Sequence, residues 1–258
     1  MQRLRVHYAK RGRLRFSSHR DFQRAFERAL RRSAVPMAYS AGFSPHPKVS
    51  YAGAAPTGVA SEAEYLELSV SARCDPERLR AELDRSLPQG LDVIEVVEAP
   101  PTPENEKARS LADLLEASVW QMTLPGVSVA EAEAAAAAFL AAESAAVSRM
   151  TKNGLRTFDA RGAVLSLQVS AGAAGAAPDG EPPRVEAAAA QPCAILQVVV
   201  RHQTPAVRPD DVLVALRQIG DLAPLQTPAV VRLAQGPLDG PTGTVSDPLA
   251  PDRGSIGG

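Results

Sequence analysis

The chain has 258 residues, which is enough for two small domains or one large one. Apolar residues make up 45% of it and aromatic residues only 4%, so a packed core has to consist mainly of Ala, Val and Leu. No run of about 18 apolar residues occurs, which excludes a membrane-spanning helix. Cys74 and Cys193 stand alone and far apart in the sequence, which argues against a zinc site or a disulfide framework.

Charge is distributed unevenly along the chain. Residues 1–50 contain twelve Lys or Arg and two acidic residues, a net charge of +10, and because the whole chain carries −1 the remainder carries −11. This polarity indicates an anionic partner for the basic end, although a solvated basic face balanced by acidic neighbours would have the same composition. No apolar segment follows the basic N-terminus, so we expect no signal peptide and a cytoplasmic protein.

The first half of the chain predicts elements in the order β-α-β-β-β-α-β. One helix is expected at residues 19–33, and a second begins at Asp75 and Pro76 and stops at Pro88. Strands are expected at residues 2–9, 37–41, 48–54, 63–70 and 91–98, with a short return strand at Leu14 and Phe16. Allowing one extra strand, this is the ferredoxin-like βαββαβ pattern.

The helix at residues 19–33 has two distinct faces. Ser18 can cap it, with Asp21 three residues on. Its apolar stripe comprises Phe22, Ala25, Phe26, Ala29 and Leu30. The opposite face carries Arg20, Arg24, Arg28 and Arg31. Like charges at spacings of four, four and three residues repel one another, which favours an anionic ligand or an acidic neighbour over this face.

The second half repeats this plan after a proline-rich linker at residues 100–116. Strands are expected at residues 117–124, 145–151, 163–170, 193–201 and 229–234, and helices at 128–142 and 209–219. We therefore predict an α+β protein of two tandem ferredoxin-like halves, residues 1–99 and 117–235. Residues 171–192 are expected to be a disordered insertion and residues 236–258 a disordered tail.

The segment between Tyr39 and Tyr51 holds the strongest local motif. Pro45 and Pro47 restrict the backbone on each side of His46, so its imidazole is held at low entropic cost. Phe43 and Tyr51 are candidates for stacking on bases, and Lys48 for contacting a phosphate. A rigid turn with an exposed histidine is the alternative.

Two further groups are candidates. Arg11, Arg13 and Arg15 in the basic turn, together with the start of the helix at His19, form a possible phosphate site, the alternative being ordinary helix capping. Candidate catalytic groups are His46, His19 and Glu64, and for Glu64 a salt bridge to an arginine is the favoured role. We expect no metal site, since His7, His19 and His46 form no i, i+4 pair, and no cofactor, since no nucleotide-binding or iron–sulfur motif occurs.

Four segments resemble a known bacterial family, the radical SAM-linked proteins, whose function is unassigned. They are Phe16–Asp21, Arg24–Arg32, Gly42–Lys48 and Gly58–Leu66. The resemblance is specific over residues 2–98 and weaker to about residue 235, and Arg20 stands where the family suggests leucine. Members are typically encoded beside, or fused to, a cobalamin-binding radical SAM protein and near a ribonuclease E/G gene. The resemblance therefore implies such an enzyme as a partner and assigns no catalytic residue.

We favour an RNA-binding accessory protein without activity of its own. Phosphates would be contacted by Arg11, Arg13, Arg15, Arg20, Arg24, Arg28 and Lys48, while Phe43, His46 or Tyr51 would contact a base. One alternative is a metal-independent RNA-processing enzyme with His46 or His19 as general acid/base. Another is a pure protein adaptor whose basic face docks an acidic patch on the radical SAM partner.

Overall fold

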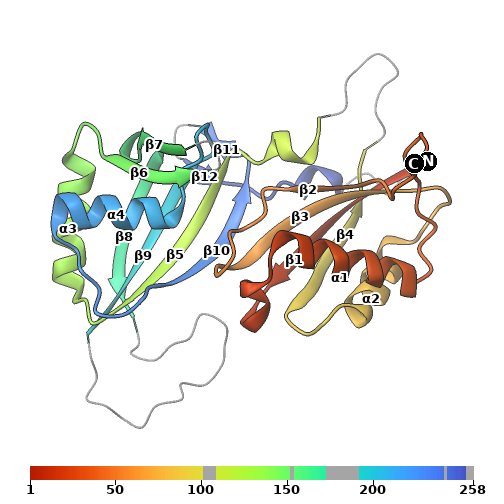
Figure 1. Ribbon diagram of the computed structural model, residues 1–258, viewed down its shortest axis with the longest axis horizontal. Coiled ribbons are helices and arrows are strands. Elements are labelled where there is room, and N and C mark those ends of the chain that lie inside the picture. Colours follow the sequence, from red (N-terminus) through yellow and green to blue (C-terminus); the bar gives the residue numbers. More distant parts are fainter. Residues whose placement is uncertain (101–108, 152–153, 173–191, 241–242, 254–258) are drawn as a thin grey trace, which may run out of the picture. The chain divides into compact units, whose positions relative to one another are not determined.

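The computed structural model describes residues 1–100, 109–151, 154–172, 192–240 and 243–253, and it has the α+β composition that was predicted (Figure 1). The chain divides into two compact units. Unit 1 comprises Met1–Leu115 and Asp247–Gly258, and unit 2 comprises Glu116–Ser246. No helix in the described part of the chain is long and apolar enough to cross a membrane.

Unit 1 is an antiparallel sheet in the order β4-β1-β3-β2, with two helices on one face (Figure 1). Its main elements are β1 (Gln2–Lys10), α1 (His19–Arg32), β2 (Val49–Ala52), β3 (Ala60–Val70), α2 (Pro76–Ser86) and β4 (Leu91–Glu98). The predicted apolar stripe of α1 is the side that enters the core, where Phe22 and Phe26 pack with Leu66 of β3 and Leu83 of α2. Each such side chain contributes about 1.5–3 kcal/mol through burial, which holds α1 with its opposite side toward solvent.

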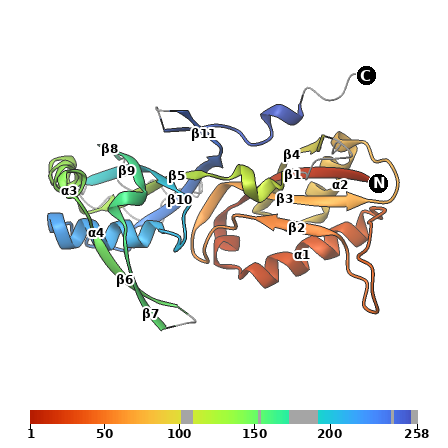
Figure 2. The ribbon, with the colours of Figure 1, turned by 90° about the horizontal axis from the view of Figure 1, so that it is seen from above.

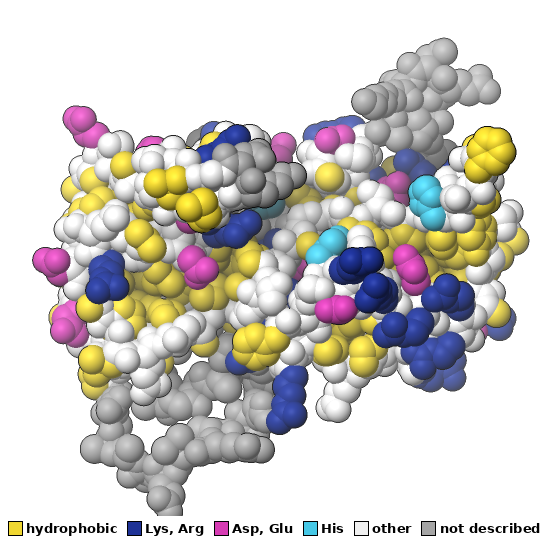
Figure 3. All heavy atoms as spheres, in the orientation of Figure 1, with side chains coloured by type: hydrophobic (Ala, Val, Ile, Leu, Met, Phe, Trp, Pro, Cys, Tyr) yellow, Lys and Arg dark blue, Asp and Glu magenta, His cyan; other side chains and the backbone are white. Residues whose placement is uncertain are grey.

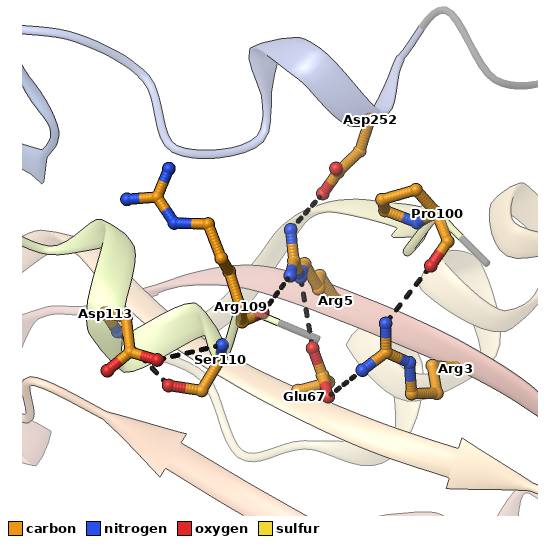
Figure 4. A network of polar contacts seen from close by, with 8 residues as sticks. All are labelled: Arg3, Arg5, Glu67, Pro100, Arg109, Ser110, Asp113 and Asp252. Carbon is orange, nitrogen blue, oxygen red and sulfur yellow. Dashed lines mark hydrogen bonds and ion pairs between the residues drawn. The ribbon is translucent and has the colours of Figure 1, made fainter. Parts of the chain in front are cut away.

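The other face of the sheet is covered by residues that were predicted as a disordered tail. Leu249 is fully buried against Tyr65 and Leu111. The C-terminal segment that carries it lies on the side of the sheet opposite α1 (Figure 2). The 3-10 helix η5 (Ala250–Asp252) carries Asp252, whose carboxylate lies 2.8 Å from the guanidinium of Arg5 on β1 (Figure 4). Both side chains are buried. The expected disordered tail is therefore incorrect for residues 247–253. Leu249 and Asp252 anchor this segment, and two isolated contacts leave no periodic pattern in the sequence from which the anchoring could be predicted.

The main strands of unit 2 are antiparallel and lie in the order β10-β5-β9-β8. Its main elements are β5 (Ala117–Pro125), α3 (Val129–Ala141), β8 (Val164–Ala171), β9 (Cys193–Arg201), α4 (Pro209–Gly220) and β10 (Ala229–Gly236). The strand expected at 145–151 is β6 (Ala146–Thr151), which pairs with the unpredicted β7 (Gly154–Asp159) as a separate hairpin. Most of the predicted insertion, residues 173–191, lies outside the described residues.

Two short segments of unit 1 differ from the predicted strands. Residues Leu14 and Phe16 belong to a 3-10 helix, η1 (Gly12–Phe16), rather than to a return strand. The segment at 37–41 forms only isolated bridges, Met37 to Val70 and Tyr39 to Pro47. Prolines at positions 36, 45 and 47 lack the N–H that a continuous ladder needs, which accounts for the loss of the strand.

Helices α3 and α4 approach so closely that they leave no room for a side chain at Gly220. A Cβ placed there would lie 2.5 Å from the Cα of Ala135. We expect Gly220→Ala to destabilise the protein by about 1–3 kcal/mol, since backbone atoms cannot yield to the added methyl group. Chemical denaturation measures this, with Gln218→Ala on the exposed side of the same helix as the control. Equal stability of both variants would contradict the close helix contact.

Candidate nucleic-acid interface

The solvent face of α1 carries a row of four arginines. Arg20, Arg24, Arg28 and Arg31, called here the α1 arginine row, are all exposed. The row spans about 16 Å along the helix, at 1.5 Å per residue. None of the four forms an ion pair within the described residues. Figure 3 shows Lys and Arg side chains gathered over the region of α1.

The acidic residues of α1 do not neutralise this row. The Asp21 carboxylate accepts a hydrogen bond from Ser18 Oγ at 2.7 Å, and Glu27 is half-buried. Arg20 and Arg24 also lie near the N-terminal end of α1, where the positive end of the helix dipole disfavours cations. Repulsion between like charges one turn apart adds about 0.2–0.5 kcal/mol per pair. An anion bound along this face would relieve both effects.

The start of α1 matches ordinary capping rather than a phosphate site. Ser18 Oγ accepts the backbone N–H of Asp21 at 3.2 Å, and the Asp21 carboxylate lies at the positive end of the helix. His19 Nε2 lies 3.0 Å from the side-chain nitrogen Nε2 of Gln23.

The basic turn before α1 contributes less than the sequence suggested. Arg11 pairs with both carboxylate oxygens of Glu62 and, at 2.7 Å, with Asp92, and these bonds raise its pKa further above the usual range. The Arg15 guanidinium lies over the Phe16 ring at 4.8 Å. Arg13 is exposed and has no ion pair in the part of the chain that the structure describes.

The loop at residues 39–48 has a fixed base and an exposed aromatic tip. At its base Ser40 N donates to the His46 carbonyl at 2.9 Å, and Ser40 Oγ lies 2.9 Å from His46 Nδ1. At its tip Gly42 has φ of +126°, which only glycine adopts readily, and Phe43 is fully exposed. His46 is therefore oriented by Ser40 as well as by its flanking prolines, while Lys48 is exposed.

Two of the predicted site residues have structural roles instead. The ring of Tyr51 packs edge-on against Phe22 at 5.6 Å and His19 at 5.3 Å, and its hydroxyl is buried without a hydrogen-bond partner among the described residues. Desolvation raises the pKa of Tyr51, with a smaller effect from the charge of Glu27. The ring of Tyr51 is thus half-buried and packs on α1.

Glu64 is also structural. It is 2% exposed, and its carboxylate accepts the Ala55 N–H at 3.2 Å. Its neighbours on β3 form arginine salt bridges, Glu62 with Arg11 and Glu67 with Arg5.

The three N-terminal histidines have separate partners. His7 Nε2 bonds the Glu62 carbonyl at 2.7 Å and its ring stacks on Tyr65, while His19 and His46 have the contacts described above. Within the described residues, no three His, Cys, Asp or Glu side chains are placed to hold a metal ion.

Helix α2 flanks the arginine-rich helix α1, although nothing in the sequence pattern assigned α2 a role. Two cavities, of about 650 Å³ and about 370 Å³, lie between α1 and α2. Both are lined by Arg32, Arg85 and Ser86. The arginines of α2 are visible in the sequence and could have indicated a further basic surface. Only the fold shows that Arg85 lies beside the end of α1.

A family model described as an uncharacterized protein conserved in bacteria (DUF2344) matches residues 3–209 of the chain. The matched region includes all of α1, the loop at residues 39–48 and α2. No curated protein matches the sequence.

Proposed function

Since the chain belongs to this bacterial family, DUF2344, we propose a function for it from the geometry of α1: the protein binds RNA through the α1 arginine row. The observation that carries the proposal is that four exposed arginines share one helix face without a carboxylate partner among the described residues. Arginine suits this role because its planar guanidinium offers several donors to phosphate oxygens.

An exposed aromatic tip supports RNA rather than an acidic protein as the ligand. Phe43 is fully exposed on a loop whose base is fixed by Ser40 and His46. Stacking of an unpaired base on such a ring contributes about 1–3 kcal/mol. A ligand that offers both phosphates and unpaired bases, such as a single-stranded region of structured RNA, matches both features.

The geometry favours binding over catalysis. Neither His19 nor His46 lines either cavity between α1 and α2. The first contacts Gln23 and the second Ser40, so neither is paired with a carboxylate that would orient it as a general base. With His46→Ala we expect RNA affinity to change little and RNA to remain uncleaved by either protein. Cleavage by the wild type that disappears in the variant would support the enzymatic alternative.

The proposed accessory role rests on the resemblance to radical SAM-linked proteins. The residues that carry it include Gly42–Lys48 and much of α1, which are also the residues of the proposed interface. In this proposal the bound RNA is presented to a cobalamin-binding radical SAM partner. Recovery of that enzyme with the protein only when RNA is intact would support presentation, whereas recovery after nuclease treatment would favour a pure protein adaptor.

We also propose that each unit has the ferredoxin-like topology. The strand orders β4-β1-β3-β2 and β10-β5-β9-β8 support it, as do the helices that follow the first and third strand of each sheet. The β6–β7 hairpin would be an addition to this topology in unit 2.

Salt dependence tests the proposal directly. The α1 arginine row, the turn before α1 and the loop at residues 39–48 together provide six exposed cations that lack an ion pair within the described ranges: Arg13, Arg20, Arg24, Arg28, Arg31 and Lys48. If each contacts one phosphate of a single strand, log K should fall with log salt with a slope of about −4. Fluorescence anisotropy of a labelled single-stranded RNA measures this slope. Binding that is independent of salt, or no binding, would overturn the proposed function.

A further inference from the structure

The two cavities between α1 and α2 adjoin one another within unit 1. The larger is lined by the end of α1, the residues that follow it and the face of α2, and the smaller by Ala25, Arg28 and the end of α2. Because both share Arg32 and Arg85, these side chains mark the junction between the cavities.

The carboxylates near this junction are already engaged. Asp75 caps α2 by accepting the backbone N–H of Arg78 at 2.8 Å. Glu82 pairs with the Arg78 guanidinium at 2.9 Å. Neither carboxylate therefore neutralises the charge of Arg32 or Arg85.

Neutral acceptors hold the arginines of the junction in place. Arg32 donates to the Ser86 carbonyl and Arg85 to the Ala81 carbonyl, the latter at 3.1 Å. Both residues lie in the last turn of a helix, where they also favour the negative end of its dipole. Each guanidinium has five N–H donors, so these contacts leave donors and charge for an anion. Arg28 adds a third guanidinium from the α1 arginine row.

The larger cavity combines this charge with apolar walls. Val35, Pro36 and Leu79 line it together with Arg32 and Arg85. Its volume of about 650 Å³ falls within the range of about 300–1,000 Å³ that is typical of small-ligand sites. An apolar wall beside guanidinium groups matches the two parts of a nucleotide, a base and a phosphate.

We propose that this cleft holds one unpaired nucleotide of the bound RNA. Arg28, Arg32 and Arg85 contact its phosphate, and its base lies against Val35 and Pro36 in the larger cavity. The inference rests on the proposed function, because Arg28 belongs both to the α1 arginine row and to the cleft. It adds a specific site to that function, since an RNA that bound only along α1 would leave the cleft open.

Cysteine alkylation provides a footprint of the cleft. Cys74 lines the larger cavity and is half-buried, while Cys193 is buried in unit 2 and serves as the internal reference. Burial raises the pKa of the Cys74 thiol, so the reaction with N-ethylmaleimide is run at alkaline pH. We expect saturating single-stranded oligouridylate to slow alkylation of Cys74 several-fold in the full chain, as followed by peptide mass spectrometry. The rate at Cys193 should not change.

A pair of variants on α2 separates the cleft from the rest of the interface. Arg85→Gln should remove the protection of Cys74 and make the salt slope less steep, by at most about 0.7, the value for one single-strand phosphate, because Arg28 and Arg32 still contact the same phosphate. Arg80→Gln is the matched control, because Arg80 lies on the same helix, pairs with Glu77 at 2.7 Å and lines neither cavity. It should retain the wild-type slope and protection.

The outcomes distinguish the two proposals. RNA binding with the expected salt slope, but with Cys74 unprotected and Arg85→Gln unchanged, would overturn the nucleotide site and leave the proposed function standing. Failure of the wild type to bind RNA would overturn the proposed function itself.

Discussion

Replacing Arg20, Arg24 and Arg28 together with glutamate is expected to abolish RNA binding by the intact chain. All three side chains are exposed on one face of α1 and have no ion pair in the described part of the chain. The change would remove three of the proposed phosphate contacts. It would also place three carboxylates where the phosphate backbone of the RNA is proposed to lie. Charged hydrogen bonds of at least about 1.5 kcal/mol each predict a loss of affinity of about a thousandfold or more. Fluorescence anisotropy at low salt measures it.

The folded state should survive this substitution, because each side chain points away from the core that Phe22 and Phe26 anchor. Glutamates at positions 20 and 24 also suit the N-terminal end of a helix. A matched control makes the same charge change in unit 2, Arg156/Arg201/Arg217→Glu, at exposed arginines without ion pairs among the described residues. Equal loss of affinity in both variants would show that net charge, rather than the face of α1, determines binding.

Removing the Arg5 side chain is expected to destabilise unit 1 more than any single surface change. Arg5 is 3% exposed and contacts Glu67 at 3.1 Å, Asp252 at 2.8 Å and the Arg109 carbonyl at 3.3 Å (Figure 4). Arg5→Ala leaves the carboxylate of Asp252 buried without its partner, which costs about 3–5 kcal/mol. Equilibrium unfolding in urea measures the loss. Arg78→Ala, which breaks an exposed pair on α2, is the control and should change stability little.

The pH dependence of this variant has a definite sign. Burial already raises the pKa of Asp252, even though Arg5 opposes the shift. Without Arg5 the pKa rises further, so the folded variant binds a proton that the unfolded chain releases above about pH 3.9. Its stability deficit should therefore grow as pH rises from acidic values toward neutral. Asp252→Asn in the Arg5→Ala background should recover part of the loss at neutral pH, and no recovery would contradict the role given to the buried charge.

The sequence predicted the elements that depend on local periodicity. The stripe from Phe22 to Leu30 defined both faces of α1, and the structure confirms that its apolar members are the buried or half-buried ones. Ser18 as the cap of α1 and Asp75 as the cap of α2 are confirmed as well, since a cap involves residues three positions apart.

Contacts between residues distant in the sequence could not be predicted in this way. Arg11 was expected to face a phosphate, but its partners Glu62 and Asp92 are 51 and 81 residues away. Glu62 and Glu67 pair with Arg11 and Arg5, which the charge pattern of β3 does not predict because it does not show where arginines lie in three dimensions. Tyr51 lies on a strand of four residues, too short for alternation to show that its ring would pack on α1.

The return of residues 247–253 to the first sheet has a consequence for the order of biosynthesis. The basic interface belongs to a unit built from both ends of the described chain, with the 131 residues of Glu116–Ser246 between them. At roughly 5–20 residues per second, Asp252 leaves the ribosomal tunnel about 10–50 seconds after its partner Arg5. Unit 2 is the unit that can fold first, and unit 1 is complete only when translation has passed residue 252. A chain stopped before that point leaves the buried Arg5 without its aspartate, so truncated products are expected to be less stable than the full chain.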